Sequence, residues 1–231
     1  MADVITHEPG PVVVAAPQWG AATRKYAVEV IGTFFLVFTV AACGFSHSAF
    51  TPLAAGAALM VMVYAGGHIS GGHYNPAVTM AALWRRRIGL ADAVAYWVAQ
   101  FAAGVIAAVV ARAVVNPPLV ATLAPSGHAL AATAVVELLF TFALCYVVLN
   151  VATSKSQLGN SFFGLAIGFT VAAGGFAVGG ISGGAFNPAV TLGAATGGLF
   201  AWSTLWVYLL VQLVAGAAAG LTFLALNPDD K

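Results

Sequence analysis

The stretch GHISGGHYNPAVTMAA, residues Gly67–Ala82, recurs as GGISGGAFNPAVTLGA at residues Gly179–Ala194. The two copies keep a constant offset of 112 positions, which also relates Tyr96 to Tyr208. A fixed internal period of this kind indicates a duplicated chain. Two Asn-Pro-Ala elements on apolar halves of similar length predict a membrane protein with two equivalent pore-facing segments. This arrangement favours a channel or carrier over an enzyme.

The composition predicts that the protein is embedded in a lipid bilayer. The chain has 231 residues, of which 61% are hydrophobic and 6% are charged, whereas soluble domains carry about 25% charged residues. The net charge of +1 predicts no nucleic-acid partner. Cys43 and Cys145 lie in apolar stretches and match no metal or disulfide motif, so we expect no metal and no cofactor.

Six segments are apolar enough to span a bilayer, which takes about 20 residues of helix. They cover residues 26–45, 53–67, 88–115, 130–151, 162–178 and 201–226. The two copies of the motif lie in shorter apolar segments that follow the second and the fifth span. The sequence therefore predicts an all-α membrane protein with an N-terminal tail (1–23), a first repeat (24–118), an outer connecting loop (119–129) and a second repeat (130–231).

The basic residues predict the orientation, because cytoplasmic loops carry an excess of Lys and Arg. If both termini lie inside, the basic residues facing the cytoplasm are Arg24, Lys25, Arg85, Arg86, Arg87, Lys155 and Lys231, and Arg112 is the exception. We therefore expect an integral, multi-pass protein of the plasma membrane with cytoplasmic termini. Each repeat has three spans, an odd number, so the second repeat must be inserted upside down relative to the first.

Each Asn-Pro pair predicts the start of a helix. Proline is favoured in the first helical turn, and asparagine just before it is a good N-cap. The nine residues from Pro76 to Trp84 make about 13 Å of helix, nearly half the hydrocarbon thickness. Asn75 and Asn187 should thus each begin a re-entrant half-helix in the middle of the membrane.

The glycine-rich runs before the motifs predict irregular backbone that lines a pore. These glycines are Gly66, Gly67, Gly71, Gly72, Gly179, Gly180, Gly183 and Gly184. Irregular backbone at membrane depth is tolerated only where protein or a water-filled cavity satisfies it. We expect carbonyl acceptors along the wall, with two asparagine amides and two half-helix N-termini at the centre. The positive ends of these helices would repel cations and interrupt a proton-conducting water chain.

With these features the chain resembles the aquaporins, the major intrinsic protein family, over nearly its whole length. The resemblance implies a homotetramer with one pore per subunit, and passage of water through the bilayer. It assigns the pore motif to Asn75, Pro76, Ala77, Asn187, Pro188 and Ala189.

Apart from Asp92 near the start of the third span, two acids lie in the predicted spans, Glu29 in the first and Glu137 in the fourth. A charge at mid-membrane costs about 2.5–3.5 kcal/mol on insertion scales, so each should have a partner. We expect the partners to be backbone N–H groups of the glycine-rich runs, because matching glutamates in the family brace these loops. A proton relay is the alternative. His73, two residues before Asn75, is a candidate pore-lining residue, with a structural role or a pH gate as the other readings.

Many family members have a narrow filter on the outer side that includes an arginine. Counted without gaps from the two asparagines, the filter positions here are Ala55, Gly175, Gly184 and Val190. Valine in place of the arginine resembles some plant vacuolar-type aquaporins. These small apolar residues predict a wide constriction that passes water and small neutral solutes such as glycerol, urea, ammonia and hydrogen peroxide.

Three alternatives stay open at this stage. A strict water channel requires that Phe176, Phe186 or the outer loops narrow the bore. A secondary transporter with inverted repeats requires coupling-ion ligands, for which the sequence offers only the two buried glutamates. An intramembrane enzyme requires a nucleophile with a base. Ser70 and Ser182 precede the motifs, but we expect no acid or histidine beside both, so the sequence predicts no enzyme.

Overall fold

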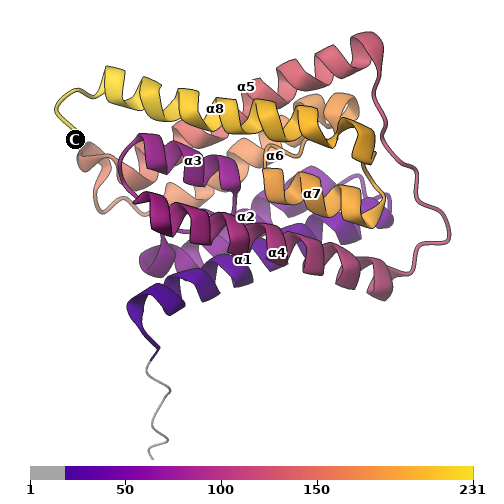
Figure 1. Cartoon of the computed structure of the whole chain (residues 1–231), viewed down its shortest axis with the longest axis horizontal. Helices are drawn as coiled ribbons and strands as arrows, with labels where there is room; N and C mark the ends of the chain where they lie inside the picture. Colours follow the sequence, from indigo (N-terminus) through magenta and orange to yellow (C-terminus); the bar gives the residue numbers. More distant parts are fainter. Residues whose placement is uncertain (1–18, 231) are drawn as a thin grey trace, which may run out of the picture.

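The computed structural model describes residues 19–230, which are almost entirely helical (Figure 1). Six long helices are apolar and long enough to cross a membrane. They are α1 (Ala21–Phe45), α2 (Thr51–Ser70), α4 (Leu90–Val115), α5 (Gly127–Thr153), α6 (Phe163–Ser182) and α8 (Leu205–Leu226). Two short helices, α3 (Pro76–Trp84) and α7 (Pro188–Gly197), and the single turns η1 (Lys155–Gln157) and η2 (Trp202–Thr204) complete the described part. The predicted fold of six spans and two half-helices is confirmed.

The first helix begins earlier than the sequence predicted. Helix α1 starts at Ala21, so the last residues of the predicted tail 1–23 are helical. Residues 1–18 of that tail lie outside the described part of the chain.

The expectation that all eight glycines before the motifs form irregular backbone is wrong. Gly66 and Gly67 belong to α2, and Gly179 and Gly180 belong to α6. The helices end only at Gly71 (φ 89°) and Gly183 (φ 84°), in the left-handed conformation that glycine adopts without strain. Their N–H groups bond the carbonyls of Gly67 and Gly179 at 2.9 and 2.8 Å. Only residues 71–74 and 183–186 form the irregular segments.

The half-helices lie end to end and lead to opposite ends of the molecule. Figure 1 shows α3 toward the end where α1 begins and α8 finishes, and α7 toward the other end. Each half-helix packs against the last long helix of the other repeat, α3 on α8 and α7 on α4. A Cβ on Gly216 would lie 2.3 Å from the Ala77 carbonyl oxygen, and one on Gly104 would lie 2.7 Å from that of Ala189. These contacts admit only glycine.

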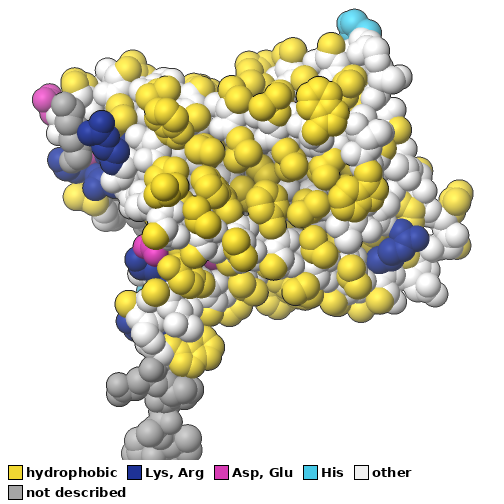
Figure 2. Space-filling model, viewed as in Figure 1, with side chains coloured by type: hydrophobic (Ala, Val, Ile, Leu, Met, Phe, Trp, Pro, Cys, Tyr) yellow, Lys and Arg dark blue, Asp and Glu magenta, His cyan; other side chains and the backbone are white. Residues whose placement is uncertain are grey.

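The outer surface is apolar around the middle of the molecule. Figure 2 shows hydrophobic side chains across the visible face, with charged groups mainly toward one end. Val98, Trp206 and Leu210 are each more than half exposed. So many exposed large apolar side chains indicate that this surface faces lipid, because a soluble monomer rarely exposes contiguous apolar surface of this extent.

Candidate functional site

Each asparagine of the repeated motif caps its half-helix. Asn75 has extended backbone (φ −158°), and its Oδ1 accepts the N–H of Ala77 at 2.8 Å. Asn187 has the same conformation (φ −157°), and its Oδ1 accepts the N–H of Ala189 at 2.9 Å. The first turns of α3 and α7 therefore begin beside the two asparagines, and both positive helix ends point to the centre of the protein.

The two caps are also tied to each other. Asn75 Nδ2 donates to the carbonyl of Phe186 at 2.9 Å. Asn187 Nδ2 donates to the carbonyl of Tyr74, also at 2.9 Å. A primary amide has two N–H donors, so this contact occupies one donor of each amide and leaves the other for the cavity.

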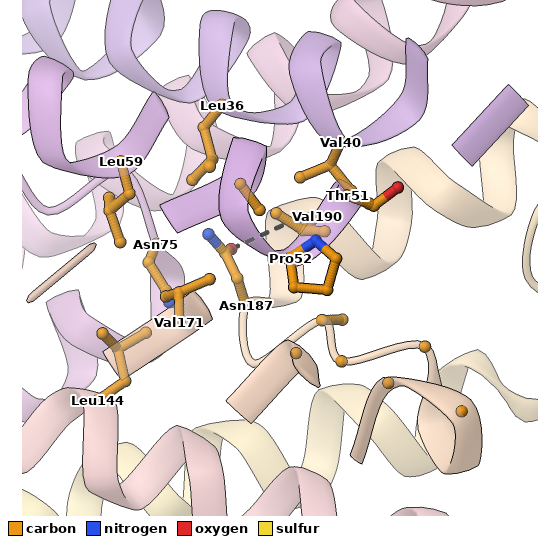
Figure 3. A pocket seen from close by; sticks show the side chains of 17 residues that line it. Leu36, Val40, Thr51, Pro52, Leu59, Asn75, Leu144, Val171, Asn187 and Val190 are labelled. Atoms are coloured by element: carbon orange, nitrogen blue, oxygen red, sulfur yellow. Dashed lines mark hydrogen bonds between the residues drawn. The ribbon is translucent and has the colours of Figure 1, made fainter. Parts of the chain in front are cut away.

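A cavity of about 270 Å³ lies between the asparagines and the end of the molecule opposite the termini (Figure 3). Both asparagines line it, and its walls carry the aliphatic side chains of Leu36, Val40, Leu59, Leu144 and Val171. The four residues counted from the sequence all line this cavity as well: Ala55, Gly175, Gly184 and Val190. No charged side chain of the described residues lines it.

The two aromatic residues named as candidates for narrowing the bore do not line this cavity. Phe176 is 61% exposed on the outer surface of α6. Phe186 is buried, and its ring packs 5.4 Å from that of Phe140. Neither ring is among the side chains that line the cavity.

Glu29 is fully buried and holds the segment before Asn75. Its carboxylate accepts the backbone N–H groups of His73 (2.9 Å) and Tyr74 (2.7 Å). It also accepts the Ser70 hydroxyl (2.7 Å) and the Gln100 amide (2.9 Å). The N–H of Gly72 donates to the Ser70 hydroxyl, which itself donates to Glu29. The carboxylate therefore holds Gly72 only indirectly.

Glu137 repeats this arrangement in the second half. It accepts the N–H groups of Ala185 (3.0 Å) and Phe186 (2.8 Å), the Ser182 hydroxyl (2.7 Å) and the Gln212 amide (2.8 Å). The expectation that no acid lies beside both serines is therefore wrong. These contacts hold the irregular segments at two points each, and four donors occupy each carboxylate.

His73 lines a second cavity of about 440 Å³, on the side of the termini. Its Nδ1 lies 3.0 Å from the Thr79 hydroxyl, and its ring packs edge-on, 5.2 Å from the ring of Tyr96. Val78 lines the same cavity and is the repeat counterpart of Val190 in the first cavity. The two cavities thus lie on opposite sides of the paired half-helices.

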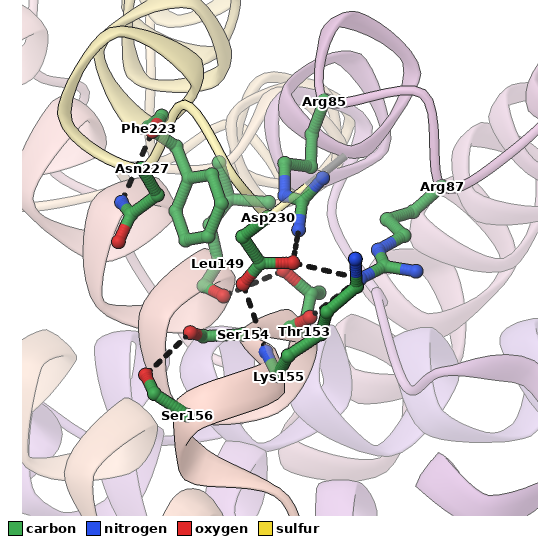
Figure 4. Close-up of polar contacts among 10 residues, drawn as sticks. All are labelled: Arg85, Arg87, Leu149, Thr153, Ser154, Lys155, Ser156, Phe223, Asn227 and Asp230. Atoms are coloured by element: carbon green, nitrogen blue, oxygen red, sulfur yellow. Dashed lines mark hydrogen bonds and ion pairs between the residues drawn. The ribbon is translucent and has the colours of Figure 1, made fainter.

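A buried ion pair lies at the end of the molecule that carries the termini, and sequence reasoning missed it (Figure 4). Arg85 was expected in a cytoplasmic loop, but its side chain is 1% exposed and donates to Asp230 at 2.7 Å. Its guanidinium also lies 4.2 Å from the centre of the Phe223 ring. The same carboxylate accepts Arg87 at 3.3 Å and the backbone N–H of Lys155 at 2.8 Å. No local pattern marks an acid this near the end of the chain as a partner.

Inverted repeats, half-helices that meet at two asparagines, and a cavity on either side define a membrane channel. The chain belongs to the major intrinsic protein family, whose sequence model matches residues 16–223.

Similar proteins come from plants, bacteria and a protozoan. The chain is 37% identical to Aquaporin NIP2-1 of Oryza sativa subsp. japonica over 219 residues, which cover 90% of this chain and 72% of the rice protein. It is 40% identical to Glycerol uptake facilitator protein-like 6 of Lactiplantibacillus plantarum, over 90% of this chain and 100% of that protein. The X-ray structure of the aquaglyceroporin from Plasmodium falciparum matches with a TM-score of 0.73 and 20% identity, covering 87% of this chain and 95% of that one. This last likeness concerns the fold alone.

Proposed function

We propose that the protein is a passive channel for water and small neutral solutes, among them glycerol, urea, ammonia and hydrogen peroxide. The observation that carries the proposal is that Ala55, Gly175, Gly184 and Val190 line one cavity without a charged side chain. A constriction walled by small residues leaves room for molecules larger than water, and without a charged side chain it has no strong donor that would hold a neutral solute in place. The bacterial relative named as a glycerol uptake facilitator supports the same solute class.

The asparagine amides supply the polar contacts in the middle of the pore. The free N–H of Asn75 and of Asn187 would donate to a water or to a solute hydroxyl as it passes. The opposite wall is aliphatic, so a solute keeps few hydrogen bonds and is not held there. Weak binding of this kind permits rapid flux in either direction, driven by the gradient.

Ions and protons would be excluded by the half-helices. The N-termini of α3 and α7 each carry about +0.5 charge and point at the same place, which repels cations. The asparagine donors would orient a central water so that it donates toward both mouths, which interrupts proton transfer along the chain. Because Val190 replaces the filter arginine, cation exclusion would depend mainly on these dipoles.

The proposal includes the surroundings of the channel. The start of α1 and the end of α8 lie at one end of the molecule together with Arg85 and Arg87. The positive-inside rule then favours cytoplasmic termini. We further propose a homotetramer in the plasma membrane, on the resemblance to the family.

The alternative of a secondary transporter has little support from the glutamates. Glu29 and Glu137 each accept four hydrogen bonds from their own repeat and line neither cavity. A coupling-ion ligand has to face the transport path. A channel without coupling therefore accounts better for both acids.

The test is stopped-flow light scattering of proteoliposomes that contain the purified protein. Shrinkage under an impermeant osmolyte reports water flux, and recovery under inward glycerol or urea gradients reports solute flux. Wild type is compared with Val190→Arg, which places a cation in the constriction, and with Val190→Leu, which adds bulk without charge. Empty liposomes give the background.

We expect fast water flux and fast solute recovery for wild type, with solute recovery lost in Val190→Arg and reduced in Val190→Leu. Fast water flux without solute recovery in wild type would overturn the solute part of the proposal in favour of a strict water channel. Saturable uptake that depends on an ion gradient would overturn the channel itself.

A further inference from the structure

An aromatic ring lies against the left-handed glycine that ends the long helix in each repeat, but the two rings come from different places in the sequence. In the first repeat a Cβ on Gly71 would meet the ring of His73 at 3.3 Å, two residues along the chain. In the second repeat a Cβ on Gly183 would meet the ring of Phe200 at 2.4 Å. The second ring comes from the segment after α7, outside the repeated motif.

The repeat-related tyrosines Tyr96 and Tyr208 show the same correspondence between the two rings. Tyr96 donates to the carbonyl of Ser70 at 2.7 Å, and the His73 ring lies 5.2 Å from its ring. Tyr208 donates to the carbonyl of Ser182 at 2.8 Å, and there the ring at 5.1 Å is that of Phe200. The repeat counterpart of His73 is Ala185, which has no ring. Phe200 therefore occupies in the second repeat the place that the histidine ring takes in the first.

The connection between α4 and α5 bonds the backbone on both sides of Phe200. The N–H of Leu123 donates to the Leu199 carbonyl at 2.8 Å, and its carbonyl accepts the Ala201 N–H at 2.9 Å, so Phe200 is fixed on both sides. The Thr122 hydroxyl adds a bond to the Gly198 carbonyl at 2.8 Å. Figure 1 shows this connection passing along the end of the molecule where α7 finishes and α8 begins.

We propose that Phe200, held in place by Leu123, is a positioning residue for solute selection, because its ring sets the position of the Gly183–Gly184 segment in the pore wall. Both glycines line the cavity that contains the four counted filter positions. The inference rests on the proposed channel function and adds to it a residue that acts through the pore wall without lining the cavity.

The ring can set the position of this segment because the two glycines have no side chains of their own and are supported by packing on one side only. Gly183 and Gly184 have the cavity on one side, and the Phe200 ring packs against Gly183 on another. Close-packed groups transmit displacement, and a supporting shell left loose shifts a site by about 1 Å, enough to change its function. Without the ring the segment gains room to retreat from the pore. The constriction then widens for the larger solutes more than for water.

The experiment measures the ratio of glycerol to water permeability in proteoliposomes for Phe200→Ala. The matched control is Trp202→Ala, which removes an exposed aromatic ring two residues further along. We expect a ratio about twofold or more above wild type for Phe200→Ala, and no change for the control. Phe200→Leu, which keeps most of the bulk, should give an intermediate ratio. It also serves as the test if Phe200→Ala does not yield folded protein.

A second pair of variants tests the contact itself. Gly183→Ala places a methyl group against the ring and should reduce flux of water and glycerol together. In Gly183→Ala/Phe200→Ala the ring is gone, so part of the flux should return, a non-additive result expected only if the two residues are in contact. If the flux changes of the two single variants simply add in the double variant, the proposal is overturned. It is also overturned if Phe200→Ala lowers the melting temperature but keeps the wild-type ratio of glycerol to water permeability, because the role of the ring is then merely structural.

The outcomes separate this inference from the proposed function. If wild type passes no glycerol, the permissive channel fails, yet the appearance of glycerol flux in Phe200→Ala still supports positioning. If wild type passes glycerol and Phe200→Ala leaves the ratio unchanged, positioning fails and the channel proposal stands.

Discussion

Asn75 and Asn187 are joined through each other's loops. Each side-chain amide donates a 2.9 Å hydrogen bond to the carbonyl of the residue that precedes the other asparagine. Each Oδ1 at the same time caps its own half-helix. The two half-helices are therefore held by one reciprocal contact, and loss of either asparagine should disturb both.

We predict that Asn187→Ala lowers the stability of the folded protein by about 2–3 kcal/mol, because it removes an N-cap and a buried hydrogen bond. Asn75→Ala should have a similar effect. The measurement is thermal unfolding in detergent with water flux in proteoliposomes. Asn150→Ala is the control, because Asn150 Nδ2 donates to the Tyr146 carbonyl at 2.8 Å but caps no half-helix. A control as damaging as the motif variants would contradict the cap argument.

We predict that Glu29→Gln and Glu137→Gln each destabilise the protein by about 1–3 kcal/mol. Each carboxylate accepts four hydrogen bonds, whereas a glutamine offers one acceptor oxygen and turns an NH₂ group toward the remaining donors. The melting temperature of the purified variants checks this, with Asp92→Asn at a more exposed position as the control.

The variants Glu29→Gln and Glu137→Gln also test the alternative that the two glutamates form a proton relay. Wild-type proteoliposomes should hold an imposed pH gradient as well as empty liposomes do. A gradient that collapses through wild type and persists in Glu29→Gln would show that the relay reading is right and the bracing reading incomplete.

The sequence predicted those parts of the site whose geometry is local. An asparagine before a proline caps a helix wherever it occurs, so the starts of α3 and α7 followed from the motif. The residue count from the asparagines put Ala55 and Gly175 in one cavity because α2 and α6 run without interruption to their left-handed glycines, and a segment of fixed length follows.

Contacts between distant segments could not be predicted in this way. Phe200 replaces the ring of His73 from another part of the chain, and Asp230 pairs with Arg85 across 145 positions. No period or spacing encodes either contact. Helical structure at Gly179 and Gly180 was also missed, because packing of the long helices outweighs the low helix propensity of glycine.

We predict opposite effects for one substitution at two helical glycines. Gly216→Ala should destabilise the protein by about 1–3 kcal/mol, because the added methyl lies 2.3 Å from the Ala77 carbonyl oxygen and displaces α3. Gly179→Ala has open space around it and lies within α6, so it should be neutral or stabilising by up to about 1 kcal/mol. Because Gly179 lines the cavity, its variant should slow glycerol more than water. Equal melting temperatures for the two variants would contradict the packing argument.

We predict that Asp230→Asn loosens the side of the molecule that carries the termini, because Arg85 is then left buried without its charge partner. Hydrogen exchange of residues 153–160 should become faster than in wild type, since the carboxylate also accepts the Lys155 N–H. Asp229→Asn, an exposed neighbour, is the control and should leave exchange unchanged.

The difference in hydrogen exchange between wild type and Asp230→Asn should depend on pH in a way that follows from the pKa of Asp230. Burial raises that pKa, but the hydrogen bonds from the Lys155 N–H and from Arg85 outweigh burial and hold it below the ordinary value of 3.8. A carboxyl group with a lowered pKa stabilises the folded state above its ordinary pKa and loses this contribution as the pH falls through the lowered value. The difference between wild type and Asp230→Asn should therefore stay constant from pH 8 down to about 5 and shrink only in stronger acid. A difference that already disappears near neutral pH would show that another group, and not this carboxylate, holds Arg85.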